Sequence, residues 1–129
     1  MWNECGTVVW TTPEWHADGP PCAPGGSAYA VCVFVPLLDL DEKTGCTQFW
    51  PGSHVHQHLL GFGPAGNVLE TTVRAQVAAG SAVLYDYRIL HRGLENTCSD
   101  GRRDVVQVVY HKPDYTEARN YSTKSLLHA

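Results

Sequence analysis

Three residues that could together hold a metal ion stand at two places in the chain. His16 and Asp18 lie two positions apart in Trp15-His16-Ala17-Asp18-Gly19, and His91 follows much later, in Leu90-His91-Arg92-Gly93. On a β-strand such a pair points to one face, with Cα atoms roughly 6 to 7 Å apart, so both side chains can reach one metal. Two histidines and one carboxylate are the ligand set of non-heme Fe(II) oxygenases, and they leave the opposite coordination positions open.

The charge of such a site indicates what else it binds. Fe(II) with one carboxylate and two neutral imidazoles carries a net charge of about +1, so a chelating dicarboxylate fits the open positions. Its second carboxylate would lie in an apolar interior, where the expected partner is an arginine with a bidentate fork. Arg102 and Arg103 stand at the head of the last predicted strand. Because consecutive strand residues face opposite ways, only one of the two can point inward.

Short strands separated by Gly, Pro and Asp clusters must position these residues, and the sequence contains no convincing long amphipathic helix or internal repeat. The apolar residues Val73, Ala75 and Val77 alternate with polar ones, which is the period of a half-buried strand. We expect a single all-β barrel or sandwich, because 129 residues are too few for two ordinary domains. The expected strands are residues 7–12, 28–38, 46–50, 71–77, 81–87 and 104–110, with turns at 41–45, 51–53 and 79–80.

Composition and charge favour a small-molecule partner. The net charge is -4, and Lys and Arg are scattered apart from Arg102-Arg103, which argues against a surface for nucleic acid or for a membrane. The longest apolar run, 28–38, is too short to span a bilayer, and the first residues do not resemble a signal peptide. The five cysteines form no CxxC pair and are expected to be reduced thiols. We therefore expect a cytoplasmic or other intracellular soluble protein, and the sequence leaves its oligomeric state open.

Further motifs around these residues closely resemble one family. After His16-Ala17-Asp18 come the segment 44–54, TGCTQFWPGSH, the segment 80–86, GSAVLYD, and the segment 91–96, HRGLEN, with Arg103 before a Val-rich strand. This order resembles the phytanoyl-CoA dioxygenase family over residues 10–121, which is most of the chain. The resemblance implies a double-stranded β-helix (jelly roll) in which His16, Asp18 and His91 bind Fe(II) and are the catalytic residues.

The resemblance also implies a cosubstrate site and a reaction. An arginine after the distal histidine would anchor 2-oxoglutarate, and Arg103 is favoured because its run into the last strand matches the family, with Arg102 as the alternative. Phe34 falls where relatives often carry an aromatic beside the cosubstrate, and Thr47 could hydrogen-bond it. Both also have ordinary explanations, as core and as strand former. The implied reaction uses O₂ and converts 2-oxoglutarate to succinate and CO₂ while an unidentified small organic substrate is hydroxylated.

The chain departs from the family pattern in two respects. Full-length members carry a substantial N-terminal region before the HxD motif, whereas this sequence has 15 residues before His16. We therefore expect residues 1–129 to be an oxygenase core, either a minimal one or a fragment that lacks this region. Gly93 stands where many relatives have a hydroxyl side chain, which would remove one cosubstrate contact.

Several other residues invite a functional interpretation. His54, His56 and His58 alternate as zinc ligands can, but the family pattern places His54 in a turn, so we expect no metal role. Asp86 is expected to support the site rather than to bind metal. The four tryptophans, Trp2, Trp10, Trp15 and Trp50, could equally line a substrate pocket or fill the core.

Two rival functions remain open at this level. A cupin-like enzyme could use Zn(II) or another divalent metal at the same three residues, and would need no buried arginine. A non-catalytic family member could keep the fold and the metal and act as a binding module.

Overall fold

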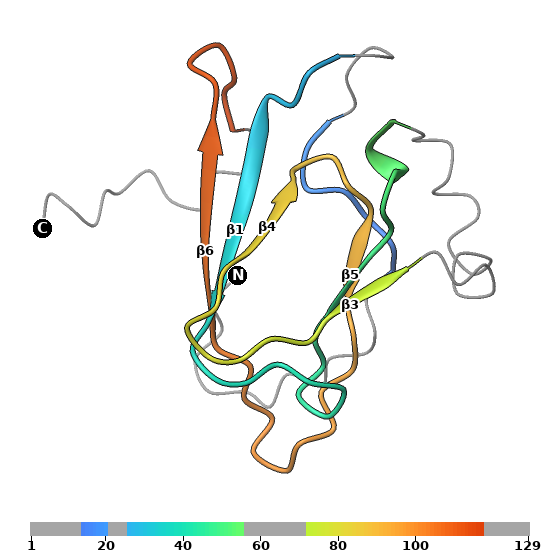
Figure 1. Cartoon of the computed structure of the whole chain (residues 1–129), viewed down its shortest axis with the longest axis vertical. Helices are drawn as coiled ribbons and strands as arrows, with labels where there is room; N and C mark the ends of the chain where they lie inside the picture. The colour runs from blue at the N-terminus through green and yellow to red at the C-terminus, as the bar shows by residue number, and fades with distance from the viewer. Residues whose placement is uncertain (1–13, 21–25, 56–71, 118–129) are drawn as a thin grey trace, which may run out of the picture.

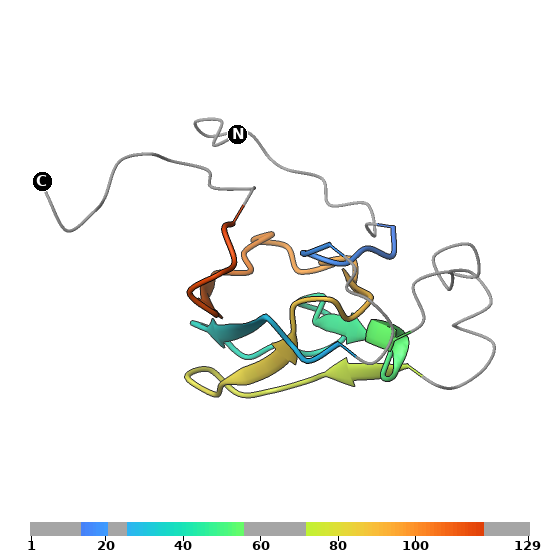
Figure 2. The ribbon, with the colours of Figure 1, turned by 90° about the horizontal axis from the view of Figure 1, so that it is seen from above.

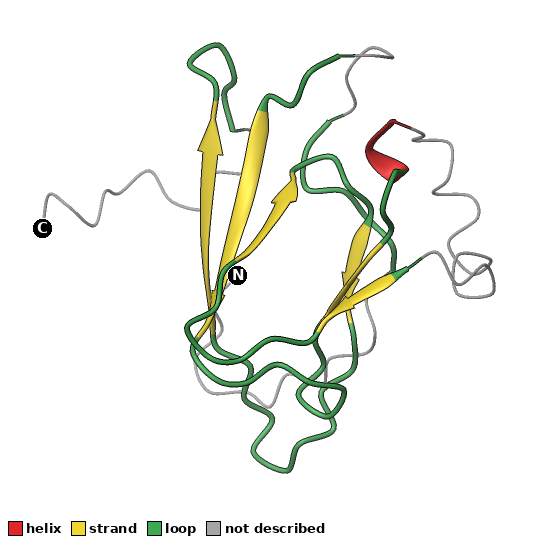
Figure 3. Cartoon of the chain, viewed as in Figure 1, coloured by secondary structure: helices red, strands yellow, loops and turns green. Residues whose placement is uncertain are grey.

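The computed structural model of the chain describes residues 14–20, 26–55 and 72–117. Within that part the chain forms strands and loops with one short 3-10 turn and no α-helix, which confirms the prediction of an all-β protein (Figure 3). No helix among the described residues is long and apolar enough to cross a membrane. The elements are β1 (Ala30–Pro36), β2 (Thr47–Phe49), η1 (Ser53–Val55), β3 (Val73–Ala75), β4 (Val83–Asp86), β5 (His91–Gly93) and β6 (Val105–His111) (Figure 1).

The strands form two antiparallel sheets. The larger has the order β4-β1-β6 and the smaller the order β3-β2-β5. Figure 1 shows the larger sheet on the left and the smaller on the right, with loops crossing between them at the lower end. In the view from above in Figure 2, β1 (cyan) and β6 (orange-red) lie on the left and β3 (yellow-green) on the right. Apart from β2 and β3, which pair within the smaller sheet, consecutive strands alternate between the two sheets.

The strand register determines which side chains face the space between the sheets. Cys32 on β1 lies opposite Tyr85 on β4 and opposite Val109 on β6. Cys32 and Tyr85 belong to a buried cluster that also contains Phe49 from the smaller sheet. The inward faces of both sheets therefore meet in one core. The buried members of this cluster are Ala30, Cys32, Phe49, Tyr85 and Tyr87.

The opposite face of the larger sheet is apolar and exposed in the described part of the chain. Val33 lies opposite Leu84 on one side and Val108 on the other. Leu84 is 65% exposed, Val108 40% and Tyr110 66%. β1 thus carries apolar residues on both faces, which explains why its sequence reads as a continuous apolar run rather than an alternating one.

A turn stabilised by side-chain hydrogen bonds lies between β1 of the larger sheet and β2 of the smaller one. The Asp41 carboxylate accepts hydrogen bonds from the backbone N–H groups of Lys43 and Thr44, both at 2.8 Å, as expected for an Asx turn. Gly45 then adopts a φ of 77°, where a Cβ would meet the Leu94 carbonyl oxygen at 2.4 Å. The turn predicted at 41–45 is confirmed, and only glycine fits its last position.

The predicted strands correspond to observed ones, although most are shorter. The expected strand at 7–12 lies outside the described residues, and the expected strand at 71–77 is reduced to the three residues of β3. Its predicted burial is wrong at Val73, which is 54% exposed. β3 lies at the edge of the smaller sheet, so Val73 has a neighbouring strand on one side only. Of the five cysteines, the three that are described, Cys32, Cys46 and Cys98, are free thiols.

Candidate metal and cosubstrate site

The segment that contains His16 and Asp18 (the HxD segment) pairs with the start of β5 through backbone hydrogen bonds. His16 and His91 form an antiparallel bridge in which His16 N–H donates to His91 O at 3.1 Å and His91 N–H donates to His16 O at 2.9 Å. The same alignment continues at Gly19, whose N–H donates to Tyr87 O at 3.0 Å. Asp18 therefore lies beside the segment that leads into His91, although the two are far apart in the sequence.

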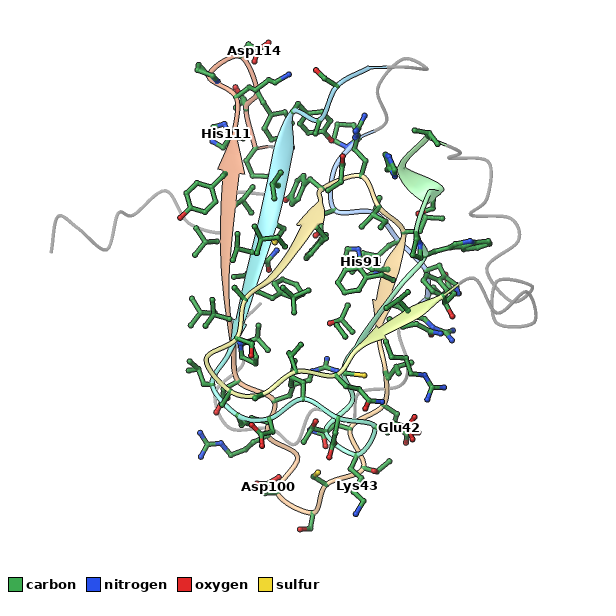
Figure 4. All side chains as sticks on the ribbon, in the orientation of Figure 1. Glu42, Lys43, His91, Asp100, His111 and Asp114 are labelled. Carbon is green, nitrogen blue, oxygen red and sulfur yellow. The ribbon has the colours of Figure 1, made fainter. Side chains whose placement is uncertain are left out.

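The three predicted ligands meet at one point between the sheets. His91 Nε2 lies 3.6 Å from Asp18 Oδ2, and His16 Nε2 lies 4.0 Å from Asp18 Oδ1. One ligand atom from each residue can be chosen so that all three lie within 4.8 Å of one another. Figure 4 shows His91 in the middle of the molecule, between the sheets. Within residues 14–20, 26–55 and 72–117, this is the only group of three or more such side chains with metal-binding spacing.

Both histidines present the ring nitrogen that a metal would need. Nδ1 of His16 lies 3.0 Å from the carbonyl oxygen of Glu14, and Nδ1 of His91 lies 3.0 Å from that of Ile89. Because a carbonyl oxygen only accepts, Nδ1 must carry a proton, and in the neutral imidazole this leaves the lone pair on Nε2, the nitrogen nearer to Asp18. Two neutral imidazole nitrogens and a carboxylate are a donor set that fits a divalent transition metal such as Fe(II).

Burial differs among the three side chains. His91 is 6% exposed, Asp18 15% and His16 43%, so the cluster is open to solvent on the His16 side. Burial lowers the pKa of His91 below its ordinary value, and this effect outweighs the Asp18 carboxylate, which raises it. His91 is therefore neutral at physiological pH, the form in which an imidazole binds metal.

Tyr85 contacts the carboxylate of the cluster and was not singled out from the sequence. Its hydroxyl donates a hydrogen bond to Asp18 Oδ2 at 2.9 Å. Burial, and secondarily the Asp18 charge, raise the pKa of Tyr85 far above its ordinary value, so the phenol remains a donor. Strand alternation could have predicted that Tyr85 points inward, because it stands two residues after the apolar Val83 on β4 and therefore shares the inward face of that residue.

The two candidate arginines occupy different environments. Arg103 points inward, and its Nη1 donates to the carbonyl oxygens of Gly45 and, at 3.0 Å, of Leu94. Its guanidinium lies against Gly93, where a Cβ would come within 3.0 Å of Nη2. Burial lowers the pKa of Arg103, but an arginine stays charged in proteins. Arg102 is 70% exposed and forms an ion pair with Asp104 at the surface.

The two remaining candidates also face the space between the sheets. Thr47 on β2 lies opposite Gly93 on β5, the residue against which the Arg103 guanidinium packs. Phe34 on β1 packs edge-on against Tyr85, with ring centroids 5.1 Å apart. Phe34 and Thr47 are both partly buried. The fold thus brings together, along one interior, the three metal-ligand candidates, Arg103, Thr47 and Phe34, and it leaves Arg102 outside.

Comparison with known proteins identifies the family. The sequence profile described as phytanoyl-CoA dioxygenase (PhyH) matches residues 5–104. The chain belongs to the phytanoyl-CoA dioxygenase family. A relative, the dioxygenase hkm4 of Aspergillus hancockii, is 34% identical over 109 residues, which cover 77% of this chain and 34% of that protein.

Solved structures share the fold. AviO1 from Streptomyces viridochromogenes Tue57 aligns with a TM-score of 0.61 at 24% identity, over 81% of this chain and 45% of that one. EvdO2 from Micromonospora carbonacea var. aurantiaca, complexed with 2-oxoglutarate, aligns with a TM-score of 0.53 at 19% identity, over 77% of this chain and 44% of that one. The predicted jelly roll is confirmed. The chain spans about a third of the curated relative and less than half of these two solved chains.

In this family member, the Asp86 carboxylate forms an ion pair with Arg88. Arg88 donates from Nε to Asp86 Oδ1 at 2.8 Å and from Nη2 to Oδ2 at 2.7 Å, and it also reaches the Gly26 carbonyl oxygen at 3.0 Å. Both oxygens of Asp86 are therefore bound by the guanidinium of Arg88, a residue that is only 4% exposed. Through its hydrogen bond to Gly26, Arg88 connects the loop before His91 to the segment that precedes β1.

The remaining candidates lie outside the metal cluster or outside the described residues. His54 is in η1 rather than in a strand, and His56 and His58 are not described. Trp15 and Trp50 pack together with Leu90 on the outer side of the smaller sheet, with ring centroids 5.7 Å apart. They alternate with His16 and Phe49, so they face away from the interior. Trp2 and Trp10 lie outside the described residues.

Proposed function

We propose that this chain is the core of an Fe(II)- and 2-oxoglutarate-dependent dioxygenase that hydroxylates a small organic substrate. The observation that carries the proposal is the interior cluster of His16, Asp18 and His91, whose ligand atoms lie within 4.8 Å of one another. Membership of the phytanoyl-CoA dioxygenase family supports the reaction class, as does the name dioxygenase borne by the relative from Aspergillus hancockii.

The three residues of the cluster would hold the metal. His16 and His91 each offer a neutral Nε2, and Asp18 offers one negative charge, so Fe(II) would retain a net charge of about +1 and attract a chelating dianion. When bound, Fe(II) and 2-oxoglutarate would supply the activation of O₂, with 2-oxoglutarate converted to succinate and CO₂. Asp18 would occupy the coordination position that related halogenases leave to a halide, so hydroxylation is the expected outcome.

Arg103 would bind the second carboxylate of 2-oxoglutarate. Its guanidinium lies beside Gly93, which is on the same strand as His91, and it carries a positive charge at a partly buried position. Thr47 lies opposite Gly93 and would donate its hydroxyl to the same carboxylate. Phe34, beside Tyr85, would form an apolar wall of the cosubstrate pocket.

The test is an anaerobic titration of the Fe(II)-loaded protein with 2-oxoglutarate, followed by the weak metal-to-ligand charge-transfer absorption in the visible range. We expect a band that saturates with 2-oxoglutarate in the wild-type chain and is absent from His91→Ala. A wild-type chain that binds Fe(II) without developing this band would exclude the oxygenase function for these 129 residues and would favour a binding-only role. Metal-dependent turnover that survives replacement of both Arg102 and Arg103 would instead favour a cupin-like enzyme.

A further inference from the structure

Each of the three proposed metal ligands has one hydrogen bond that orients it. The two histidines use local ones, from Nδ1 to the carbonyl oxygen two residues earlier, Glu14 for His16 and Ile89 for His91. Asp18 is different, because its partner is the Tyr85 hydroxyl, which comes from the larger sheet.

We propose that Tyr85 is a positioning residue that orients the Asp18 carboxylate for metal binding. The proposal rests on the proposed function, in that it takes Asp18 to be a metal ligand. Rotation of an aspartate carboxylate about χ2 has only broad preferences, so the side chain alone does not fix where its oxygens point. The hydrogen bond from Tyr85 to Oδ2, at 2.9 Å, restricts that rotation, so that Oδ1 stays toward His16 and Oδ2 toward His91.

The phenol is itself held in place by packing. Its ring centroid lies 4.9 Å from that of Phe49, 5.0 Å from that of His91 and 5.1 Å from that of Phe34. Only 6% of Tyr85 is exposed. A hydrogen-bond donor whose ring is packed on several sides loses little entropy when a metal binds next to it, which is the condition for preorganisation.

Contacts within the larger sheet extend this support to β1 and β6. Cys32 lies directly opposite Tyr85 on β1, and the two side chains belong to the same buried cluster. The Gln107 amide on β6 donates to Cys32 Sγ at 3.1 Å. A continuous chain of contacts therefore runs from β6 through β1 and β4 to Asp18, and it links the metal ligand to all three strands of the larger sheet.

The decisive variant is Tyr85→Phe, which removes the hydroxyl and keeps the packed ring. Loss of a hydrogen bond to a metal ligand typically weakens metal affinity by about 10- to 100-fold. The matched control is Tyr87→Phe, because Tyr87 is buried in the same cluster, the Glu117 carboxylate is the charge that most affects its pKa, and it is Tyr85 that donates the hydrogen bond to Asp18. Both variants lose one phenolic oxygen from the same core, but only the first loses a contact to Asp18.

The experiment is a titration of the apoproteins with Co(II), which reports affinity and, through its d–d absorption, the ligand geometry. Circular dichroism and the melting temperature of each apoprotein first establish that it is folded, and His91→Ala is included. We expect Tyr85→Phe to lose about 10- to 100-fold in Co(II) affinity with an altered d–d spectrum, and Tyr87→Phe to remain within about twofold of wild type. A purely structural role of Tyr85 would change the melting temperature but not the spectrum of the loaded protein.

Two results would count against the proposal in distinguishable ways. Wild-type affinity and spectrum in folded Tyr85→Phe would overturn the role of Tyr85 and leave the metal site intact. Equal Co(II) binding by the wild-type chain and His91→Ala would overturn the metal site itself, and the role of Tyr85 with it.

Discussion

His16 and His91 lie directly opposite each other and exchange both of their backbone hydrogen bonds, at 3.1 and 2.9 Å. Their imidazole rings follow this alignment, with centroids 4.5 Å apart. The contact that brings the two proposed ligands together is thus made by the main chain and does not depend on either side chain. The backbone bridge therefore places positions 16 and 91 side by side whatever side chains they carry.

Replacing either histidine by alanine should therefore abolish metal binding without undoing the fold. The cost in stability should differ, because the His16 side chain is 43% exposed and that of His91 only 6%. We expect His16→Ala to change the free energy of unfolding of the apoprotein by less than about 0.5 kcal/mol, and His91→Ala to lower it by about 1–3 kcal/mol. Urea denaturation of the apoproteins measures both, and equal costs would contradict the burial difference on which this prediction depends.

The two adjacent arginines should have opposite importance for the cosubstrate. Arg103→Gln removes the inward guanidinium, and we expect 2-oxoglutarate to bind about 100-fold more weakly, since two charge-assisted hydrogen bonds contribute about 3 kcal/mol. Arg102→Gln is the matched control and should remain within about twofold of wild type, because Arg102 is 70% exposed and pairs with Asp104. Calorimetric titration of the metal-loaded, oxygen-free proteins gives the two affinities.

Arg103 also donates to the carbonyl oxygens of Gly45 and Leu94, so Arg103→Gln must be shown to fold. An unchanged Co(II) affinity in that variant would show that the metal site is intact while the cosubstrate site is not. A larger loss of 2-oxoglutarate affinity in Arg102→Gln than in Arg103→Gln would mean that the wrong arginine has been assigned.

Gly93→Ala should affect the cosubstrate more than the metal. An added Cβ would lie 3.0 Å from Nη2 and 3.2 Å from Nη1 of Arg103, closer than side chains normally approach, so the guanidinium would have to shift by a few tenths of an ångström. We expect 2-oxoglutarate affinity to fall by about 3- to 10-fold, equivalent to about 1 kcal/mol, with Co(II) affinity unchanged. Parallel losses of both affinities would indicate a general disturbance of β5 instead.

The sequence alone was sufficient to relate those site residues that lie close together along the chain. His16 and Asp18 were paired by their spacing of two, and one of Arg102 and Arg103 had to face inward by strand alternation. Alternation does not say which of the two does so, because that depends on where the strand begins. β6 begins at Val105, and the contacts of Arg103 with Gly45 and Leu94 are made by loops whose lengths no periodic pattern specifies.

Tyr85 was missed for a related reason. Its inward direction follows from the alternation in β4, but its contact with Asp18 depends on how the HxD segment aligns with residues 87–91. That alignment is a pairing between distant segments, and a single sequence carries no local signal for it. The exposure of Val73 was likewise mispredicted, because its alternation is that of a buried strand while its position is at a sheet edge.

The pair formed by Asp86 and Arg88 should stabilise the loop before His91 in a pH-dependent manner. Burial raises the pKa of the Asp86 carboxyl, but the hydrogen bonds and charge of Arg88 lower it by more, so it lies below its ordinary value in the folded state. The unfolded chain therefore binds more protons in that range, and the stabilisation is present above the ordinary aspartate pKa of about 3.9 and is lost as the pH falls through the folded value.

Asp86→Asn should lower the free energy of unfolding by about 2–3 kcal/mol at pH 7, because it leaves the 4% exposed Arg88 without its carboxylate. The loss is smaller than for a fully buried pair, since the Asp86 side chain is 21% exposed. Asp104→Asn, which breaks the exposed pair with Arg102, is the control and should cost less than about 1 kcal/mol. Urea denaturation at pH 7 and at about pH 3 should show the difference between wild type and Asp86→Asn shrinking in acid. A difference that stays constant over this range would mean that the ionised carboxylate is not what stabilises the loop.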